Sequence, residues 1–233
     1  MNYGEIERKT FRTFLAYAAI LITLNLLFFM INSNIYRIKN IVYDESSKLS
    51  IQSLEDLRGT SIWLVDDTYF DTFYIENPEV ERISIKKELP DTILVDIFKS
   101  DKLAYIQDNR RTPPKRYILH KNLYTLESKS KEGLLIVNID NGPVKEGFFE
   151  EIVTLAMTLK KYPINLANLE INYDGQTMIA IHFGSHFYLG SAYDLGRKAA
   201  VIGFYISEEP CEGEVRLVYS EDGSTINAIT NCN

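Results

Sequence analysis

The amino-acid sequence predicts an α+β protein held at a membrane by one N-terminal transmembrane helix. Three observations lead to this fold class. A mostly apolar run without charged residues covers residues 14–31. Short segments of alternating apolar and polar residues, typical of strands, follow it. Amphipathic helical segments lie between these strands, so we expect a mostly antiparallel sheet with helices on one face.

The apolar run is long enough to cross a bilayer. At about 1.5 Å per residue it spans roughly 27 Å, close to the thickness of the hydrocarbon core. Only Thr23 and Asn25 interrupt it with clearly polar side chains. A cleaved signal peptide would have a shorter run ending in small residues, but here Asn32, Ser33 and Asn34 follow. We therefore expect an uncleaved anchor, in which Asn25 either bonds to a partner helix or is simply tolerated.

Basic residues on the two sides of the span indicate its orientation. Arg8, Lys9 and Arg12 precede it, whereas Arg37 and Lys39 follow it. This margin of one predicts that a short tail, residues 1–13, lies in the cytoplasm and that the large remainder lies outside it. The expected arrangement is a single-pass type II protein of the cytoplasmic membrane.

The charge balance argues against a nucleic-acid-binding function. The chain has 233 residues and a formal net charge of −7, and the tail is slightly basic, so the body is more acidic than the whole. Binding to phosphate backbones needs clustered Lys and Arg. The one basic cluster lies between Arg110 and Arg116 and flanks Pro113-Pro114. We interpret it as a solvated loop.

Two cysteines, Cys211 and Cys232, lie near the C-terminus. Two in a chain of this length do not make a disulfide scaffold. Outside the cytoplasm they would form either one disulfide or two free thiols, and the sequence leaves both alternatives open.

The first domain is expected over residues 35–106, in the order strand, helix, helix, strand, strand. A strand over 37–43 follows the anchor directly. Ser50 is the expected N-cap of a short helix that ends near Gly59. Asp66 and Asp67 begin a second helix, where carboxylates suit the positive helix end. Two alternating strands near 80–87 and 93–98 complete the domain.

The second domain is expected over residues 116–220, after a polar joint at 108–115. Asp174-Gly175 is a strong hairpin signal between two strands. Val215, Leu217 and Tyr219 form a late alternating strand, and residues 221–233 are expected as a C-terminal tail. The other expected elements are strands near 116–119, 123–126, 134–139 and 186–189, and helices near 146–160 and 192–206.

No residue pattern predicts catalysis, a cofactor or a bound metal. His182 and His186 flank a turn, but no third ligand is apparent near them. Asp66, Asp67 and Asp71 fit helix capping better than a pair of catalytic carboxylates. Ser185 lies in Gly-Ser-His, which is not a nucleophile elbow. We expect a non-enzymatic protein without a small-molecule substrate.

The first domain contains a set of short motifs in a definite order. Ser50 is followed by Gly59-Thr-Ser-Ile62, then by Asn77-Pro-Glu-Val80 and by Leu89-Pro-Asp-Thr-Ile-Leu-Val95. These motifs resemble those of the FtsQ/DivIB family of bacterial cell division proteins, in which the domain after the anchor is a POTRA domain with the same order of elements. The resemblance therefore implies a POTRA domain over residues 35–106, lying close to the membrane surface.

The second domain carries further family motifs. Ile181-His-Phe-Gly184 and Phe187-Tyr-Leu-Gly190 precede Asp194-Leu195 and Lys198, in the family's order. The resemblance covers nearly the whole chain. It departs from the family pattern at His120-Lys121-Asn122, where members often have an Asp-x-x-Gly turn.

The resemblance implies a scaffold of the divisome that is enriched at the septum. Family members bind FtsB/DivIC-like and FtsL-like single-span proteins and so help to recruit and regulate septal peptidoglycan synthesis. The partner adds a strand to an exposed sheet edge in the second domain. Transferred here, the candidate partner-binding residues are Val215, Leu217 and Tyr219, with Tyr205 on the preceding helix. Val215 and Leu217 fit an ordinary core position equally well.

Two other functions remain as alternatives. One is a single-span POTRA protein that handles secretion or outer-membrane substrates. It is disfavoured because the motifs of the second domain are not part of a bare POTRA domain. The other is a membrane-anchored wall hydrolase, which would need a catalytic constellation that the sequence does not show.

Overall fold

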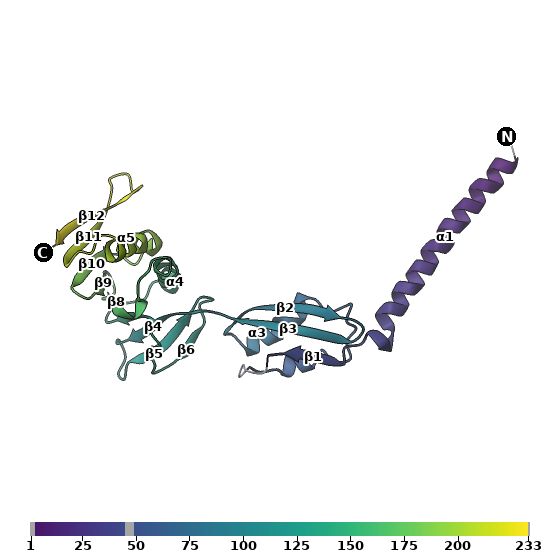
Figure 1. Ribbon diagram of the computed structural model, residues 1–233, viewed down its shortest axis with the longest axis horizontal. Coiled ribbons are helices and arrows are strands. Elements are labelled where there is room, and N and C mark those ends of the chain that lie inside the picture. The colour runs from purple at the N-terminus through teal and green to yellow at the C-terminus, as the bar shows by residue number, and fades with distance from the viewer. Residues whose placement is uncertain (1–2, 45–48, 233) are drawn as a thin grey trace. The chain divides into compact units, whose positions relative to one another are not determined.

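The computed structural model describes residues 3–44 and 49–232, with side chains from residue 11 onwards (Figure 1). The chain divides into two compact units, Met1–Lys99 and Ser100–Asn233. Both contain helices and strands, so the chain is an α+β protein as the sequence predicts.

The N-terminal helix α1, Tyr3–Asn32, contains the apolar run. Its segment Phe11–Asn32 is long and apolar enough to cross a membrane, and none of that segment is buried within the protein. This is the pattern of a signal anchor or a signal sequence. The two polar side chains bond to the backbone of the same helix, Thr23 to Ala19 O and Asn25 to Leu21 O, each at 2.8 Å. The helix itself thus satisfies one N–H of the Asn25 amide.

The first unit continues with a three-stranded mixed sheet and short helices. The strand order is β1-β3-β2, with β1 parallel and β2 antiparallel to β3. The expected order of strand, helix, helix, strand, strand is confirmed. The elements are η1 Asn34–Tyr36, β1 Asn40–Tyr43, α2 Gln52–Glu55, η2 Asp67–Phe70, α3 Asp71–Glu76, β2 Val80–Glu88 and β3 Thr92–Lys99.

Polar side chains cap one short helix of this unit and connect the segment before another to α3. Asp66 caps η2 as expected, since its Oδ1 accepts a hydrogen bond from Thr68 N at 3.0 Å. The expectation for Ser50 is wrong, because Ile51 is the N-cap of α2 and provides no side-chain hydrogen bond. Ser50 instead bonds to the buried Asn77: Ser50 N donates to Asn77 Oδ1 at 2.7 Å, and Asn77 Nδ2 donates to Ser50 O at 2.9 Å.

The core of the first unit lies between its sheet and its helices. Phe73 and Ile93 have no exposed surface, and Phe70 and Val95 are each 2% exposed. Asn77 closes this core at the end of α3, because its Nδ2 also donates to Phe73 O at 3.0 Å. The amide thus joins α3 to the segment that precedes α2.

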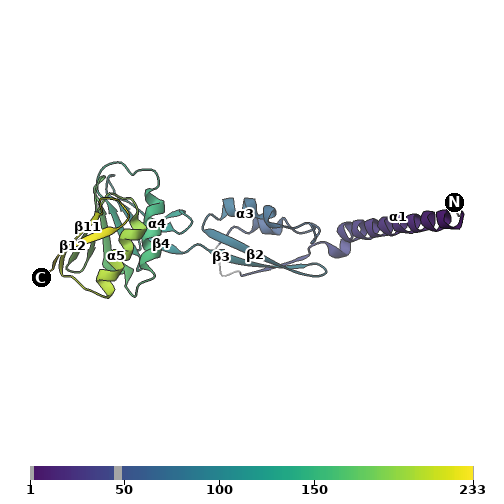
Figure 2. The same ribbon diagram turned by 90° about the horizontal axis from the view of Figure 1, so that it is seen from above.

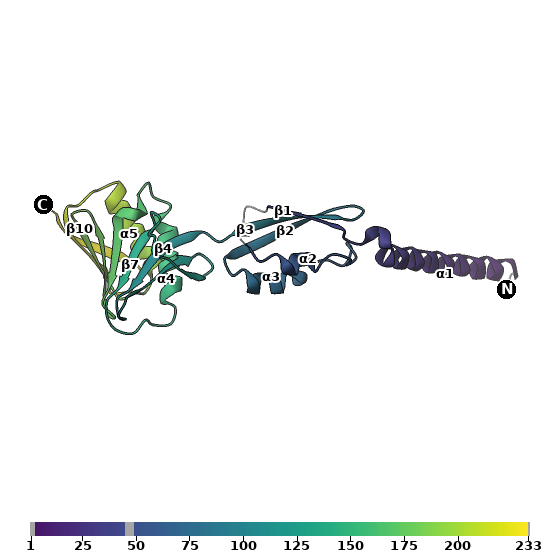
Figure 3. The same ribbon diagram turned by 90° about the horizontal axis from the view of Figure 1, so that it is seen from below.

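The second unit is a nine-stranded sheet, seen from two further directions in Figures 2 and 3. The strand order is β12-β11-β10-β9-β8-β7-β4-β5-β6, and five of the eight neighbouring pairs are antiparallel. Its strands are β4 Lys102–Asp108, β5 Lys115–His120, β6 Thr125–Glu127, β7 Leu135–Ile139, β8 Leu169–Tyr173, β9 Met178–His182, β10 Ser185–Gly190, β11 Gly213–Tyr219 and β12 Ile226–Cys232.

Two helices, α4 Phe148–Leu159 and α5 Leu195–Ser207, pack on one face of this sheet. Both contribute to the same core as one row of paired strand residues, which includes Ile171, Ala180 and Phe187. The helices touch closely, since a Cβ atom on Gly203 of α5 would lie 2.4 Å from the ring of Tyr162, just after α4. The segment between α4 and β8 contains the remaining short helix η3, Leu166–Asn168.

The boundary between the units differs from the expected joint. Residues up to 106 were expected to belong to the first domain, but residues 102–108 form β4, which pairs with β5 and β7 in the large sheet. Leu103, Ala104 and Ile106 are buried in the core of the second unit. The polar stretch around Pro113-Pro114 connects β4 to β5 within that sheet. Prolines and charges mark a loop here rather than a domain boundary.

We predict that Asn77→Ala destabilises the first unit by about 2–3 kcal/mol. The substitution leaves polar backbone groups of Ser50 and Phe73 without their partner, and unpaired buried groups carry this cost. Denaturant unfolding of the purified chain measures the change. The matched control is Asn40→Ala on the exposed face of β1, with an expected effect below about 0.5 kcal/mol. Equal effects of the two substitutions would contradict the role given to Asn77.

Candidate functional site

Strand β12 ends the large sheet and is the candidate site. It pairs with β11 along its whole length, from Gly213↔Cys232 to Tyr219↔Ile226. Among the described residues no strand pairs with its other side. A free sheet edge offers backbone N–H and C=O groups to an incoming strand. The side chains of Asn227 and Ile229, the latter 60% exposed, lie beside this edge in contact with solvent.

The strand expected at the edge, β11, lies one position further in, because β12 covers it. Val215 is fully buried, and Leu217 is half-buried against the same core. These two residues are therefore core residues of an internal strand. Residues 226–232 were expected within a C-terminal tail. These residues read Ile-Asn-Ala-Ile-Thr-Asn-Cys, and the two isoleucines fall on opposite faces of the strand, so no regular apolar alternation marks it in the sequence.

Tyr219 connects the end of β11 to the beginning of α5. Its hydroxyl donates a hydrogen bond to Asp194 Oδ2 at 3.1 Å. The side chains of Arg197 and Lys198 lie over its ring, at 5.6 and 5.5 Å from the centroid. Burial, followed by the bonded Asp194 carboxylate, raises the pKa of Tyr219 above its usual value. The hydroxyl therefore stays protonated as a donor at neutral pH.

Tyr205 does not join this group of residues. It lies near the C-terminal end of α5, half-buried against the core, with its ring 5.7 Å from that of Phe204. Tyr219 contacts the opposite end of the helix. The structure thus separates two residues that the sequence grouped as one site.

Lys198 is a buried cation at the first turn of α5, with only 1% of its surface exposed. Its Nζ donates to Ser191 O at 2.8 Å. Burial lowers the pKa of Lys198, while the nearby carboxylates Asp194 and Glu151 act in the opposite direction. Glu151 also reaches α5 directly, since its Oε2 accepts from Leu195 N at 2.7 Å. These contacts hold the beginning of α5 against the end of β10 and against α4.

Arg197 holds the turn of the β11–β12 hairpin against α5. Its guanidinium pairs with Asp194 and donates to Ser224 O at 3.1 Å and to Gly223 O at 3.4 Å. Within the turn, Asp222 accepts hydrogen bonds from Ser224 N at 3.0 Å and from Ser220 Oγ at 2.6 Å. These hydrogen bonds, the hydroxyl bonds foremost, lower the pKa of Asp222 to about 2.

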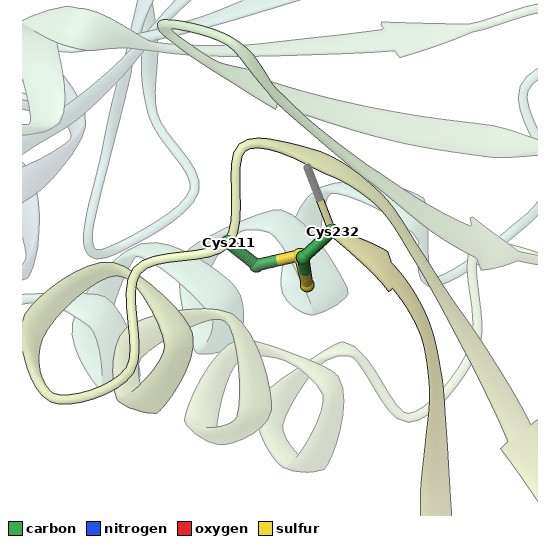
Figure 4. Close-up of a disulfide and its surroundings, with 2 residues drawn as sticks. All are labelled: Cys211 and Cys232. Atoms are coloured by element: carbon green, nitrogen blue, oxygen red, sulfur yellow. A yellow bond between two sulfur atoms is a disulfide. The ribbon is translucent and has the colours of Figure 1, made fainter.

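The opposite end of β12 is held by a disulfide. Cys232, the last residue of β12, is bonded to Cys211, which lies in the segment between α5 and β11 (Figure 4). Of the two alternatives for these cysteines, the structure thus has the disulfide. Cys211 is buried in the core, whereas Cys232 lies at the exposed edge. Strand β12 is thus attached to the rest of the second unit at both of its ends.

Polar and aromatic side chains lie beside β12 on the sheet face opposite the helices. Arg216, the register partner of Ile229, lies over the ring of Tyr188 at 4.8 Å and donates to Glu214 at 3.1 Å. Tyr188 Oη donates to the same carboxylate at 3.2 Å. These bonds, the one from Arg216 first, lower the pKa of Glu214, which therefore stays ionised near neutral pH. The surface beside the edge is fixed and partly charged.

The remaining candidate residues lie apart from this edge. Asp66 caps η2 in the first unit. His182 and His186 lie on β9 and β10, and burial lowers the pKa of His182. Within residues 3–44 and 49–232, no group of three or more His, Cys, Asp and Glu side chains is arranged to hold a metal ion. A groove of about 700 Å³ lies between residues 111–116 and 127–129, and four of its nine lining residues are basic.

Comparison with protein-family models finds no matching family, and comparison with curated proteins finds no matching relative. We therefore infer function from the geometry of the β12 edge and from the order of the sequence motifs.

We predict that reduction of the disulfide destabilises the second unit by about 3 kcal/mol. The bond closes a loop across a sequence separation of 21 residues, and the chain entropy of such a loop gives a cost of this size. Denaturant unfolding with and without a thiol reductant measures it. A variant with both Cys211→Ser and Cys232→Ser is the control and should not respond to reductant. A response of that variant would mean that the reductant acts elsewhere.

We also predict that Asp222 stabilises the hairpin turn at neutral pH but not in strong acid. Because its pKa is lower in the folded state, its contribution is full above about pH 4 and disappears as the pH falls through about 2. Asp222→Asn should therefore lower the free energy of unfolding at pH 6 and differ little from the unsubstituted protein near pH 2. The exposed neighbour variant Glu221→Gln is the comparison. A deficit that is the same at both pH values would contradict this assignment.

Proposed function

We propose that this protein is a non-enzymatic scaffold of the bacterial divisome, similar to FtsQ/DivIB proteins. It binds FtsB/DivIC-like and FtsL-like single-span partners and so helps to recruit and regulate septal peptidoglycan synthesis. The observation that carries the proposal is the free edge of β12, held at one end by Arg197 and at the other by the disulfide.

The free edge fits strand addition by a partner. In that mode, main-chain hydrogen bonds provide affinity and alternate side chains provide specificity. An edge that is already ordered loses less conformational entropy when a strand joins it. Ile229 lies beside the edge as an exposed apolar side chain, with Asn227 and Asn231 exposed two residues away on either side.

The motifs that suggested the family have structural roles that support the proposal. Gly59 N donates to Ile38 O at 2.8 Å, so the Gly-Thr-Ser-Ile motif adjoins the segment before β1. Asn77 of the Asn-Pro-Glu-Val motif is the buried amide that closes α3. Lys198 anchors the beginning of α5. We infer a POTRA domain in the first unit and the family's β domain in the second.

The proposed location is the cytoplasmic membrane, with α1 as an uncleaved anchor and the N-terminus inside the cell. The disulfide supports this orientation, because such bonds persist in oxidising compartments outside the cytoplasm. The basic residues before the span support the same choice. The septum is the expected site of enrichment.

A binding experiment with an edge variant tests the proposal. Ile229→Asp places a charge on the exposed edge without touching the core, and we expect at least a tenfold weaker binding to an FtsB/DivIC-like partner in a pull-down from membranes. The matched control is Ile75→Asp, at a residue 81% exposed on α3 in the first unit, with binding unchanged. Tyr219→Asp should also abolish binding, because it removes the bond to Asp194.

Two results would contradict the proposal. One is undiminished partner binding by Ile229→Asp. The other is a fluorescent fusion of the full chain that stains the membrane uniformly instead of concentrating at midcell.

A further inference from the structure

Within the first unit, four exposed apolar side chains lie at the end of the three-stranded sheet where the chain enters from α1. We call this set the apolar tip. Its members come from three separate segments: the one after α1, the one between α2 and η2, and the turn between β2 and β3. They are Ile35, Trp63, Leu64 and Leu89, with exposed fractions of 57%, 37%, 50% and 56%.

Backbone hydrogen bonds bring these segments together. Ile62 N donates to Tyr36 O at 2.8 Å, and the rings of Tyr36 and Trp63 lie 5.6 Å apart. On the other side, Lys39 N donates to Asp91 O at 2.9 Å, which fixes the turn that carries Leu89. The tip is therefore an ordered surface built on the sheet of the first unit.

The chain between α1 and the tip is short. The helix ends at Asn32, and the carbonyl of Tyr36 is already bonded to Ile62. Four residue steps of extended chain reach at most about 14 Å. If α1 crosses a bilayer, this tether keeps the tip within or just above the headgroup layer, which is roughly 5–8 Å thick on each side.

Charges around the tip are largely paired. Lys39 contacts Asp91 at 3.0 Å, and Lys86 contacts Glu88 at 3.6 Å. Arg58 is paired with Glu55. Arg37 donates to a backbone carbonyl, Gly59 O, at 2.9 Å. The exposed side chains of the tip itself are apolar and aromatic. Tryptophan and tyrosine side chains favour the membrane interface.

We propose that the apolar tip inserts into the interface of the same bilayer that α1 spans, and so forms a second membrane contact. Trp63 and Tyr36 lie at the level of the headgroups, and Ile35, Leu64 and Leu89 reach the acyl boundary. Burial of these side chains removes apolar surface from water and restricts rotation of the first unit about the tether. The inference depends on α1 remaining attached as a span and does not depend on the proposed divisome partners.

Trp63 is the only tryptophan in the sequence and is therefore a specific probe. The full chain is reconstituted into phosphatidylcholine vesicles with or without bromine atoms on the acyl chains near the headgroup. Insertion predicts that bromine quenches Trp63 emission strongly, and that quenching persists in about 0.5 M salt, where electrostatic attachment is screened. Equal emission in brominated and unbrominated vesicles would overturn the proposal, and so would loss of quenching in salt.

Variants distinguish insertion from accidental proximity. Leu64→Ser and Leu89→Ser each remove an exposed side chain of the tip and leave the core intact, so both should weaken the quenching of Trp63 by a factor of two or more. The matched control is Ile75→Ser, at an exposed apolar residue outside the tip, which should quench like the unsubstituted chain. Full quenching in both leucine variants would show that the tip does not hold Trp63 in the lipid. Partner pull-down is read separately, so failure of the divisome proposal leaves this result unaffected.

Discussion

Strand β12 presents an ordered edge because the hairpin that carries it is attached at both ends. At the turn, Arg197 of α5 donates hydrogen bonds to two hairpin carbonyl groups. At the other end, Cys232 is bonded to Cys211. Without these two attachments, β12 would be held only by its hydrogen bonds to β11 and its ends would fray. A frayed strand must be ordered again when a partner binds, which costs free energy. The proposed binding function of β12 therefore depends on Arg197 of α5 and on the disulfide.

The beginning of α5 is in turn fixed by buried polar groups. Lys198 lies almost fully buried and donates to Ser191 O, while Asp194 accepts from Tyr219 and pairs with Arg197. Removing one member of such a network leaves another without its partner, which is why substitutions here should act beyond their own position. Tyr219 thus stabilises the β11–β12 hairpin, and its hydroxyl already donates a hydrogen bond to Asp194.

The sequence predicted the elements that have local signals and missed those that depend on tertiary contacts. Asp66 at the start of η2 and the hairpin turn at Asp174 were predictable, because their side chains bond to nearby backbone N–H groups. Ser50 was expected to cap a helix, but its long-range bonds to Asn77 take precedence. Strand β12 was missed because its sequence lacks a regular apolar alternation and the strand is stabilised by pairing with β11 and by the disulfide.

The difference between local signals and tertiary contacts also explains which residues of the candidate site the sequence could predict. Alternation in β11 predicted a strand, but it could not show that another strand lies beside it. Tyr219 was expected as a partner-binding residue of this strand, and the structure adds its bond to Asp194. The contribution of Arg197 had no signal in the sequence, since a single arginine on a helix does not indicate which carbonyl groups it reaches.

Amide hydrogen exchange of residues 226–232, with and without an FtsB/DivIC-like partner, tests the central claim most directly. Strand addition predicts that the β12 amides directed away from β11 become protected when the partner binds, while the amides bonded to β11 stay protected throughout. Partner binding that leaves exchange in β12 unchanged would contradict the account.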